Sequence, residues 1–77
     1  MSKICEVIVN FIIDYYRENH FYPNYDEIAT GIGRAKSTVF MHMKKLEGEG
    51  VIIRKDDYSS QYRLINMGFM DRRTQLN

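Results

Sequence analysis

Paired glycines divide the centre of this 77-residue chain into short segments. Gly31 and Gly33 lie close together, as do Gly48 and Gly50, and Pro23 is the only proline. Glycine tolerates the left-handed backbone conformation in which helices end, and proline pushes the residue before it toward extended geometry. Any helix between Pro23 and Gly50 must therefore be short. A length of 77 residues leaves room for one domain.

Residues 2–19 are predicted to form a helix with a wide apolar surface. One stripe recurs at helical spacing, and it contains Ile4, Ile8, Phe11 and Tyr15. A second stripe runs beside it through Cys5, Val9, Ile12, Ile13 and Tyr16. Together the two stripes form an apolar surface wider than a surface helix of a small monomer needs, so we predict a homodimer. The residues expected to pack across its two-fold axis are Cys5, Val9, Ile13 and Tyr16. The alternative is that a hairpin or the tail covers the second stripe.

Two further short helices are predicted over residues 24–32 and 36–48. Asn24 followed by Glu27 matches a capping box, in which two side chains satisfy backbone amides at a helix start. The buried stripe of the later helix is marked by Val39, Met43 and Leu46. Its opposite face carries Ser37, Thr38, Met41, Lys44 and Lys45. That helix is therefore expected to have one face in the core and one in solvent.

Residues 51–55 and 61–65 are predicted to be strands joined by the polar link 56–60 as a β-hairpin. Residues 67–77 have no clear period, so we interpret them as a tail that follows a domain spanning residues 1–66. The predicted fold class is α+β, mostly α, with three helices and a C-terminal two-stranded hairpin. Phe21, in the connector before Pro23, is expected to enter the core.

The distribution of charge is more informative than the net charge of +1. Residues 1–33 have a net charge of −3 and residues 56–77 balance at zero. Residues 34–55 contain six cations and two anions, so they have a net charge of +4. The positive charge thus lies in one central stretch, as expected for a surface that faces phosphate.

Several classes of function lack the residues they would need. Cys5 is the only cysteine, which suits a reducing cytoplasm, and Cys5, His20 and His42 are too few for a structural zinc site. No apolar run has the roughly 20 residues that span a membrane. We find no nucleophile–base pair, paired-carboxylate site or phosphate-binding glycine loop. We therefore expect a cytoplasmic protein that is not an enzyme and has no metal, cofactor or small-molecule substrate.

Two short helices joined by a glycine-containing turn are the helix-turn-helix pattern, whose second helix enters the major groove of DNA. The residues that carry a family resemblance here are Ile28-Ala29, Gly33, Ser37-Thr38-Val39, His42 to Glu47, and Gly50-Val51-Ile52. In this order and spacing they resemble winged-helix bacterial regulators, most of all the N-terminal DNA-binding domain of the LexA repressors, over roughly residues 4–65. The resemblance implies a recognition helix that begins near Lys36 and a wing from Arg54 to Arg63.

The resemblance implies that the recognition helix contacts DNA through Lys36, Ser37, Thr38, Met41 and Lys44. With the neighbouring cations, the predicted DNA-binding residues are Arg34, Lys36, Ser37, Thr38, Met41, Lys44, Lys45, Arg54, Lys55 and Arg63. For the lysines and the wing, the alternative is an ordinary solvated surface. Ser37 or Thr38 alternatively caps the helix. Phe40 and Met41 either contact thymine methyl groups or pack on another protein.

These observations predict a sequence-specific transcription regulator of double-stranded DNA, a repressor of the phage or mobile-element type. It is expected to bind as a homodimer. The alternative is a winged-helix protein-interaction module that does not bind DNA, which the low net charge and the apolar Phe40 and Met41 would fit.

Overall fold

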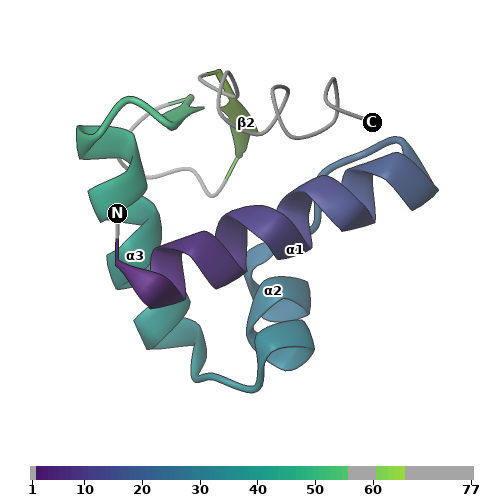
Figure 1. Cartoon of the computed structure of the whole chain (residues 1–77), viewed down its shortest axis with the longest axis horizontal. Helices are drawn as coiled ribbons and strands as arrows, with labels where there is room; N and C mark the ends of the chain where they lie inside the picture. Colours follow the sequence, from purple (N-terminus) through teal and green to yellow (C-terminus); the bar gives the residue numbers. More distant parts are fainter. Residues whose placement is uncertain (1, 56–60, 66–77) are drawn as a thin grey trace.

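The computed structural model describes residues 2–55 and 61–65. In chain order the elements are α1 (Lys3–Asn19), α2 (Tyr25–Ile32), α3 (Lys36–Gly48), β1 (Ile52–Arg54) and β2 (Tyr62–Leu64). Figure 1 shows α1 running across the molecule, with α2 on one side of it and β2 on the other. Three helices followed by an antiparallel hairpin confirm the predicted α+β winged-helix fold class. The predicted link 56–60 and tail 67–77 lie outside the described residues.

The helices begin and end where local chemistry favours it. Ser2 caps α1, because its Oγ accepts a hydrogen bond from the Cys5 amide at 3.2 Å. The predicted capping box starts α2: the Asn24 side chain accepts from the Glu27 amide, and the Glu27 carboxylate accepts from the Asn24 amide, both at 2.8 Å. Gly33 ends α2 with a φ of 70°, in the left-handed conformation expected of a helix-ending glycine.

Gly31 has a different role from the one expected of it. It lies inside α2 rather than beyond its end, and a Cβ atom at this position would overlap the ring of Phe11 on α1. The missing side chain therefore lets α1 and α2 pack closely, while Gly33 alone ends the helix.

The second apolar stripe of α1, apart from Tyr16, is buried within a single chain. Cys5, Val9 and Ile13 are 0%, 2% and 6% exposed, and they belong to the same core cluster as residues of α3 and of the hairpin. The prediction that these three residues form a dimer interface is therefore wrong, because the chain's own elements cover them. Of the four predicted interface residues only Tyr16 is exposed, and its ring packs on Tyr22 with centroids 4.7 Å apart.

Phe21 also differs from expectation, because its side chain is 56% exposed. Its ring meets the edge of Tyr15 on the surface instead of entering the core, with centroids 5.6 Å apart. The core position in the connector is taken by Pro23, which is fully buried. No helix within residues 2–55 or 61–65 is long and apolar enough to cross a membrane.

Tyrosines attach the hairpin to the helices. The Tyr62 hydroxyl on β2 donates to the Pro23 carbonyl at 2.7 Å, and the Tyr22 hydroxyl accepts from the Leu64 amide at 3.3 Å. The rings of Tyr22 and Tyr62 lie 5.3 Å apart, and Tyr25 of α2 lies 6.0 Å from Tyr62. Burial raises the pKa of Tyr62, so its hydroxyl stays protonated and remains a donor. The connector between α1 and α2 thus holds one strand of the hairpin in place.

A second contact joins α1 to the start of α2. The Tyr15 hydroxyl donates to Glu27 at 2.6 Å, so this carboxylate accepts from both the capping amide and α1. The Tyr15 hydrogen bond, followed by that of the Asn24 amide, holds the pKa of Glu27 below its ordinary value of 4.5. A lowered carboxyl pKa in the folded state stabilises the fold above pH 4.5, and this stabilisation is lost as the pH falls through the folded value.

We therefore predict that Tyr15→Phe raises the pKa of Glu27 toward 4.5 and weakens the loss of stability on acidification. The pKa can be measured by NMR titration of the Glu27 carboxyl carbon, and stability by urea unfolding across the acid range. Tyr16→Phe is the matched control, since it removes a hydroxyl from the next residue of α1. An unchanged Glu27 pKa in Tyr15→Phe would contradict this account of the α1–α2 contact.

Candidate nucleic-acid interface

Helix α3 has the two faces that the sequence predicts. One face is in the core and consists of Val39, His42, Met43 and Leu46, none of them more than 7% exposed. The other is exposed and consists of Lys36, Ser37, Phe40, Met41, Lys44 and Lys45. Thr38 lies at the boundary and is half-buried. A helix with this division presents an outer face while the core holds it in place.

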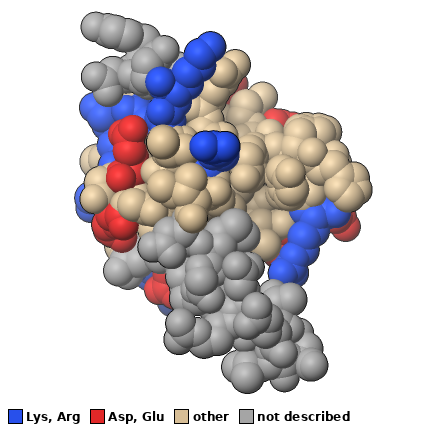
Figure 2. Space-filling view, turned by 90° about the horizontal axis from the view of Figure 1, so that it is seen from above, with Lys and Arg blue, Asp and Glu red and all other residues tan. Residues whose placement is uncertain are grey.

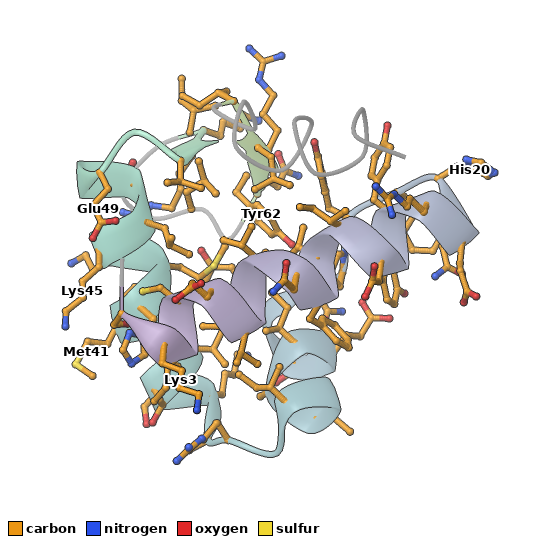
Figure 3. The ribbon with its side chains drawn as sticks, in the orientation of Figure 1. Lys3, His20, Met41, Lys45, Glu49 and Tyr62 are labelled. Atoms are coloured by element: carbon orange, nitrogen blue, oxygen red, sulfur yellow. The ribbon has the colours of Figure 1, made fainter. Side chains whose placement is uncertain are left out.

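The most outward residues of α3 form a row. Ser37, Met41 and Lys44 follow one another at i, i+4 and i+7, so they lie along one line of the helix surface. Lys45 flanks this row. Figure 3 shows Met41 and Lys45 projecting from the side of α3 that faces away from α1 and α2. This row is the part of α3 best placed to contact another molecule.

The start of α3 is also open to a partner. Ala35 is the N-cap residue and makes no side-chain hydrogen bond, so neither Ser37 nor Thr38 provides the cap that was the alternative to DNA contact. The first amides of a helix carry partial positive charge and favour an anion. Here they lie beside the exposed Lys36 and Ser37 and follow the exposed Arg34 of the turn. Lys36 also pairs with Asp26 of α2 at 3.4 Å, but both side chains are exposed and such pairs are weak.

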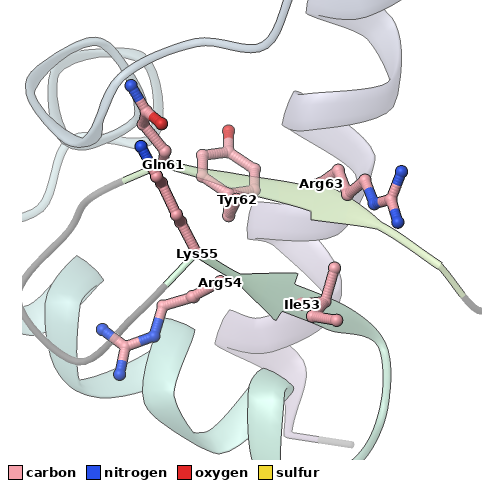
Figure 4. Close-up of a pocket in the computed structure, with 6 residues that line it drawn as sticks. All are labelled: Ile53, Arg54, Lys55, Gln61, Tyr62 and Arg63. Carbon is pink, nitrogen blue, oxygen red and sulfur yellow. The ribbon is translucent and has the colours of Figure 1, made fainter.

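Arg54 does not lie where the sequence prediction put it. Its side chain is only 2% exposed, and its Nε donates to Glu47 of α3 at 3.0 Å. Figure 4 shows the guanidinium extending over α3, whereas Arg63 points elsewhere. Arg54 is therefore not available to the wing surface, and its prediction as a DNA-binding residue is corrected. The reason is the alternation of strand side chains: Ile52 and Arg54 share the inner face of β1, and Ile53 faces outward.

Arg54 completes a cluster that joins α2, α3 and β1. The Phe40 ring of α3 meets the edge of Tyr25, with centroids 6.0 Å apart. The Arg54 guanidinium carbon lies 5.9 Å from the Phe40 ring centroid, and Lys44 Nζ lies 5.6 Å from it. Burial raises the pKa of Tyr25, and Arg54 partly offsets that rise. The cluster connects the exposed face of α3 to the hairpin, and the sequence analysis did not group these residues together.

The outer face of the hairpin carries the other predicted wing cations. β1 and β2 pair in the register Ile53 opposite Arg63, and both side chains are exposed. Lys55 and Gln61 continue this face and are also exposed, and the Lys55 amide donates to the Gln61 carbonyl at 3.1 Å. In the view from above, Lys and Arg appear in several separate places, some of them beside Asp or Glu (Figure 2). Among the described residues of the hairpin, the exposed cations are thus Lys55 and Arg63.

Beneath α3, Cys5 and His42 form a buried contact, with Sγ 3.4 Å from Nδ1. Both side chains are buried, at 0% and 7% exposed. Within the two described stretches, no three His, Cys, Asp or Glu side chains lie close enough together to hold a metal ion.

The chain is 38% identical over 48 residues to a LexA repressor of Syntrophobacter fumaroxidans. The aligned stretch covers 61% of this chain and 23% of that repressor, so the match spans less than a quarter of the relative's length. No family model matches the chain. Taken with the three helices and the hairpin, the similarity confirms the predicted resemblance to the winged helix-turn-helix domain of LexA repressors.

The structural role of Arg54 predicts that Glu47→Gln destabilises the fold. Removing the carboxylate leaves a guanidinium side chain that is nearly inaccessible to solvent without its ionic partner. The full cost of breaking a buried pair is reduced because the Glu47 side chain is 36% exposed, so we expect a loss of about 1–3 kcal/mol in the free energy of unfolding. Urea unfolding measures this loss.

Glu49→Gln is the matched control, because it removes the same charge from an exposed position at the end of α3. We expect its effect to stay within about 0.5 kcal/mol. Equal stability of the two variants would show that the pair does not hold the hairpin to α3.

Proposed function

We propose that this chain is a winged-helix regulator of transcription that binds double-stranded DNA, with α3 in the major groove and the hairpin on the flanking DNA. The observation that carries the proposal is the exposed side of α3, where Ser37, Met41, Lys44 and Lys45 lie opposite a fully buried stripe. The LexA repressor similarity supports the same function.

The size and charge of this surface fit a duplex. The major groove is about 12 Å wide and admits one α-helix with its side chains. Lys44 and Lys45 lie on the exposed side of α3, and Lys36 and Arg34 lie near its start. This arrangement suits a helix whose middle faces base edges while its ends and flanks meet phosphates. Lys55 and Arg63 are the wing cations available for the flanking DNA.

We further propose that the chain acts in the cytoplasm as a non-enzymatic, sequence-specific repressor of the phage or mobile-element type, and that it binds DNA as a homodimer. Two copies would occupy half-sites about 10 bp apart, or a multiple of that spacing. Because Cys5, Val9 and Ile13 are buried, the copies would meet through other residues. Analytical ultracentrifugation with and without a bound duplex tests the stoichiometry, and one copy per site would contradict the dimer.

The second candidate function is a protein-interaction module. The observation in its favour is apolar exposure on α3, where Phe40 is 41% and Met41 is 53% exposed. An electrophoretic shift on random-sequence DNA at low and high salt separates the two functions. A shift that appears at low salt and weakens at high salt supports DNA binding, whereas no shift at low salt supports the protein partner.

The proposed interface predicts how binding depends on salt. If four to six phosphates are neutralised per copy, the logarithm of the binding constant should fall with the logarithm of salt concentration with a slope of about −4 to −5 for each bound copy. The change expected for each variant is likewise counted per copy. Lys44→Ala or Lys45→Ala should each reduce the steepness of that slope by about 0.9, because each removes about one phosphate contact. Fluorescence anisotropy on a labelled duplex, repeated over a salt series, provides the slopes.

Arg17→Gln is the charge-matched control. It removes one cation from the C-terminal end of α1, which lies at the opposite side of the molecule from α3 (Figure 1). We expect its slope to match that of the unaltered chain. If both lysine variants also keep the original slope, α3 is not the surface that meets the phosphates.

A further inference from the structure

Met41 lies in the middle of the exposed row of α3. Its side chain is 53% exposed, which is more than that of its neighbour Phe40 at 41%. Ser37 precedes it by one helical turn and Lys44 follows it by nearly one turn, so a polar residue and a cation lie at its two ends. Figure 3 shows Met41 projecting away from the body of the molecule. An apolar side chain thus occupies the position on α3 from which a base edge would be reached.

Phe40 differs from Met41 because its ring contacts residues of α2 and β1. Its ring packs against Tyr25 of α2, and the cations of Lys44 and Arg54 lie 5.6 and 5.9 Å from its centroid. These contacts direct Phe40 toward α2 and β1. Met41 is one residue further along, about 100° around the helix, and belongs to the outward row. Of the two apolar residues, Met41 is therefore the one presented to a partner.

The surroundings of Met41 favour an anionic partner with an apolar group at its centre. Lys44 and Lys45 lie three and four residues beyond it and are both exposed. The major groove combines phosphates along its edges with one apolar group among the base edges, the C5 methyl of thymine. A thioether side chain is flexible and apolar, and it adapts to such a contact. A purely apolar protein surface would offer the flanking cations no anion.

We infer that Met41 is a base-reading residue that recognises thymine through its C5 methyl group. This inference rests on the proposed function and specifies the base that α3 selects. It predicts that the sites preferred by this chain contain a thymine whose methyl group, rather than its hydrogen-bonding pattern, is required.

The test compares thymine with uracil, which differs from it only by that methyl group. A duplex is first obtained by in-vitro selection from random-sequence DNA with the full chain. Each thymine of the selected site is then replaced in turn by deoxyuridine, and affinities are measured for the unaltered chain and for Met41→Ala. We expect at least one replacement to weaken binding of the unaltered chain by about three- to fivefold, as for the loss of one buried methyl group. The same replacement should leave the affinity of Met41→Ala unchanged.

Two further variants make the assignment specific to Met41. Val7→Ala shortens an apolar side chain on α1 that is 43% exposed, and it should keep the preference for thymine over uracil. Phe40→Ala should keep it as well, and circular dichroism confirms that each variant is folded. Loss of the preference in Phe40→Ala with its retention in Met41→Ala would overturn the assignment.

The remaining outcomes distinguish a failure of the Met41 assignment from a failure of the proposed function. If the chain binds a selected duplex but no uracil replacement matters, the assignment to Met41 fails and the proposed function stands. If selection enriches no sequence and the chain shifts no DNA at low salt, the proposed function fails and the assignment fails with it.

Discussion

The structure depends on the burial of one face of α3. Val39, Met43 and Leu46 are each fully buried, and α3 packs against both α1 and α2 as well as β1. Full burial of one such side chain contributes about 1.5–3 kcal/mol, which is a large share of the stability of so small a domain. Because a helix is rigid about its axis, fixing this face also fixes the opposite one. The outward position of Ser37, Met41 and Lys44 is therefore a consequence of how the core is packed.

The hairpin is held to the helices by polar and aromatic contacts as well as apolar ones. Tyr62 bonds to the Pro23 carbonyl, and Arg54 bonds to Glu47 on α3. The Phe40 ring lies beside the Arg54 guanidinium, so one cluster connects β1 to the exposed side of α3. A hairpin attached in this way keeps a set orientation relative to α3, which the proposed contact with two parts of a duplex requires.

Most of the fold was predictable because local signals agreed with the tertiary structure. The capping box at Asn24 and the glycine at position 33 define α2, and the i, i+4, i+7 spacing of apolar residues defines α3. The burial of Cys5, Val9 and Ile13 was not predictable from a single helix, because a wide apolar arc looks the same whether the chain or a second copy covers it. Gly31 was misread for a similar reason, since its role depends on where Phe11 of another helix lies.

For the candidate site, the exposed residues of α3 were predicted and Arg54 was not. Its charge suggested a surface role, yet alternation along β1 places it on the inner face with Ile52. That signal was present in the sequence, but the partner Glu47 lies on a different element and is found only in three dimensions.

The most direct test of the central claim is an NMR titration of the ¹⁵N-labelled chain with a random-sequence duplex at low salt. The account predicts that amide shifts concentrate at Ser37, Met41 and Lys44, and shifts confined to α1, or none at all, would contradict it.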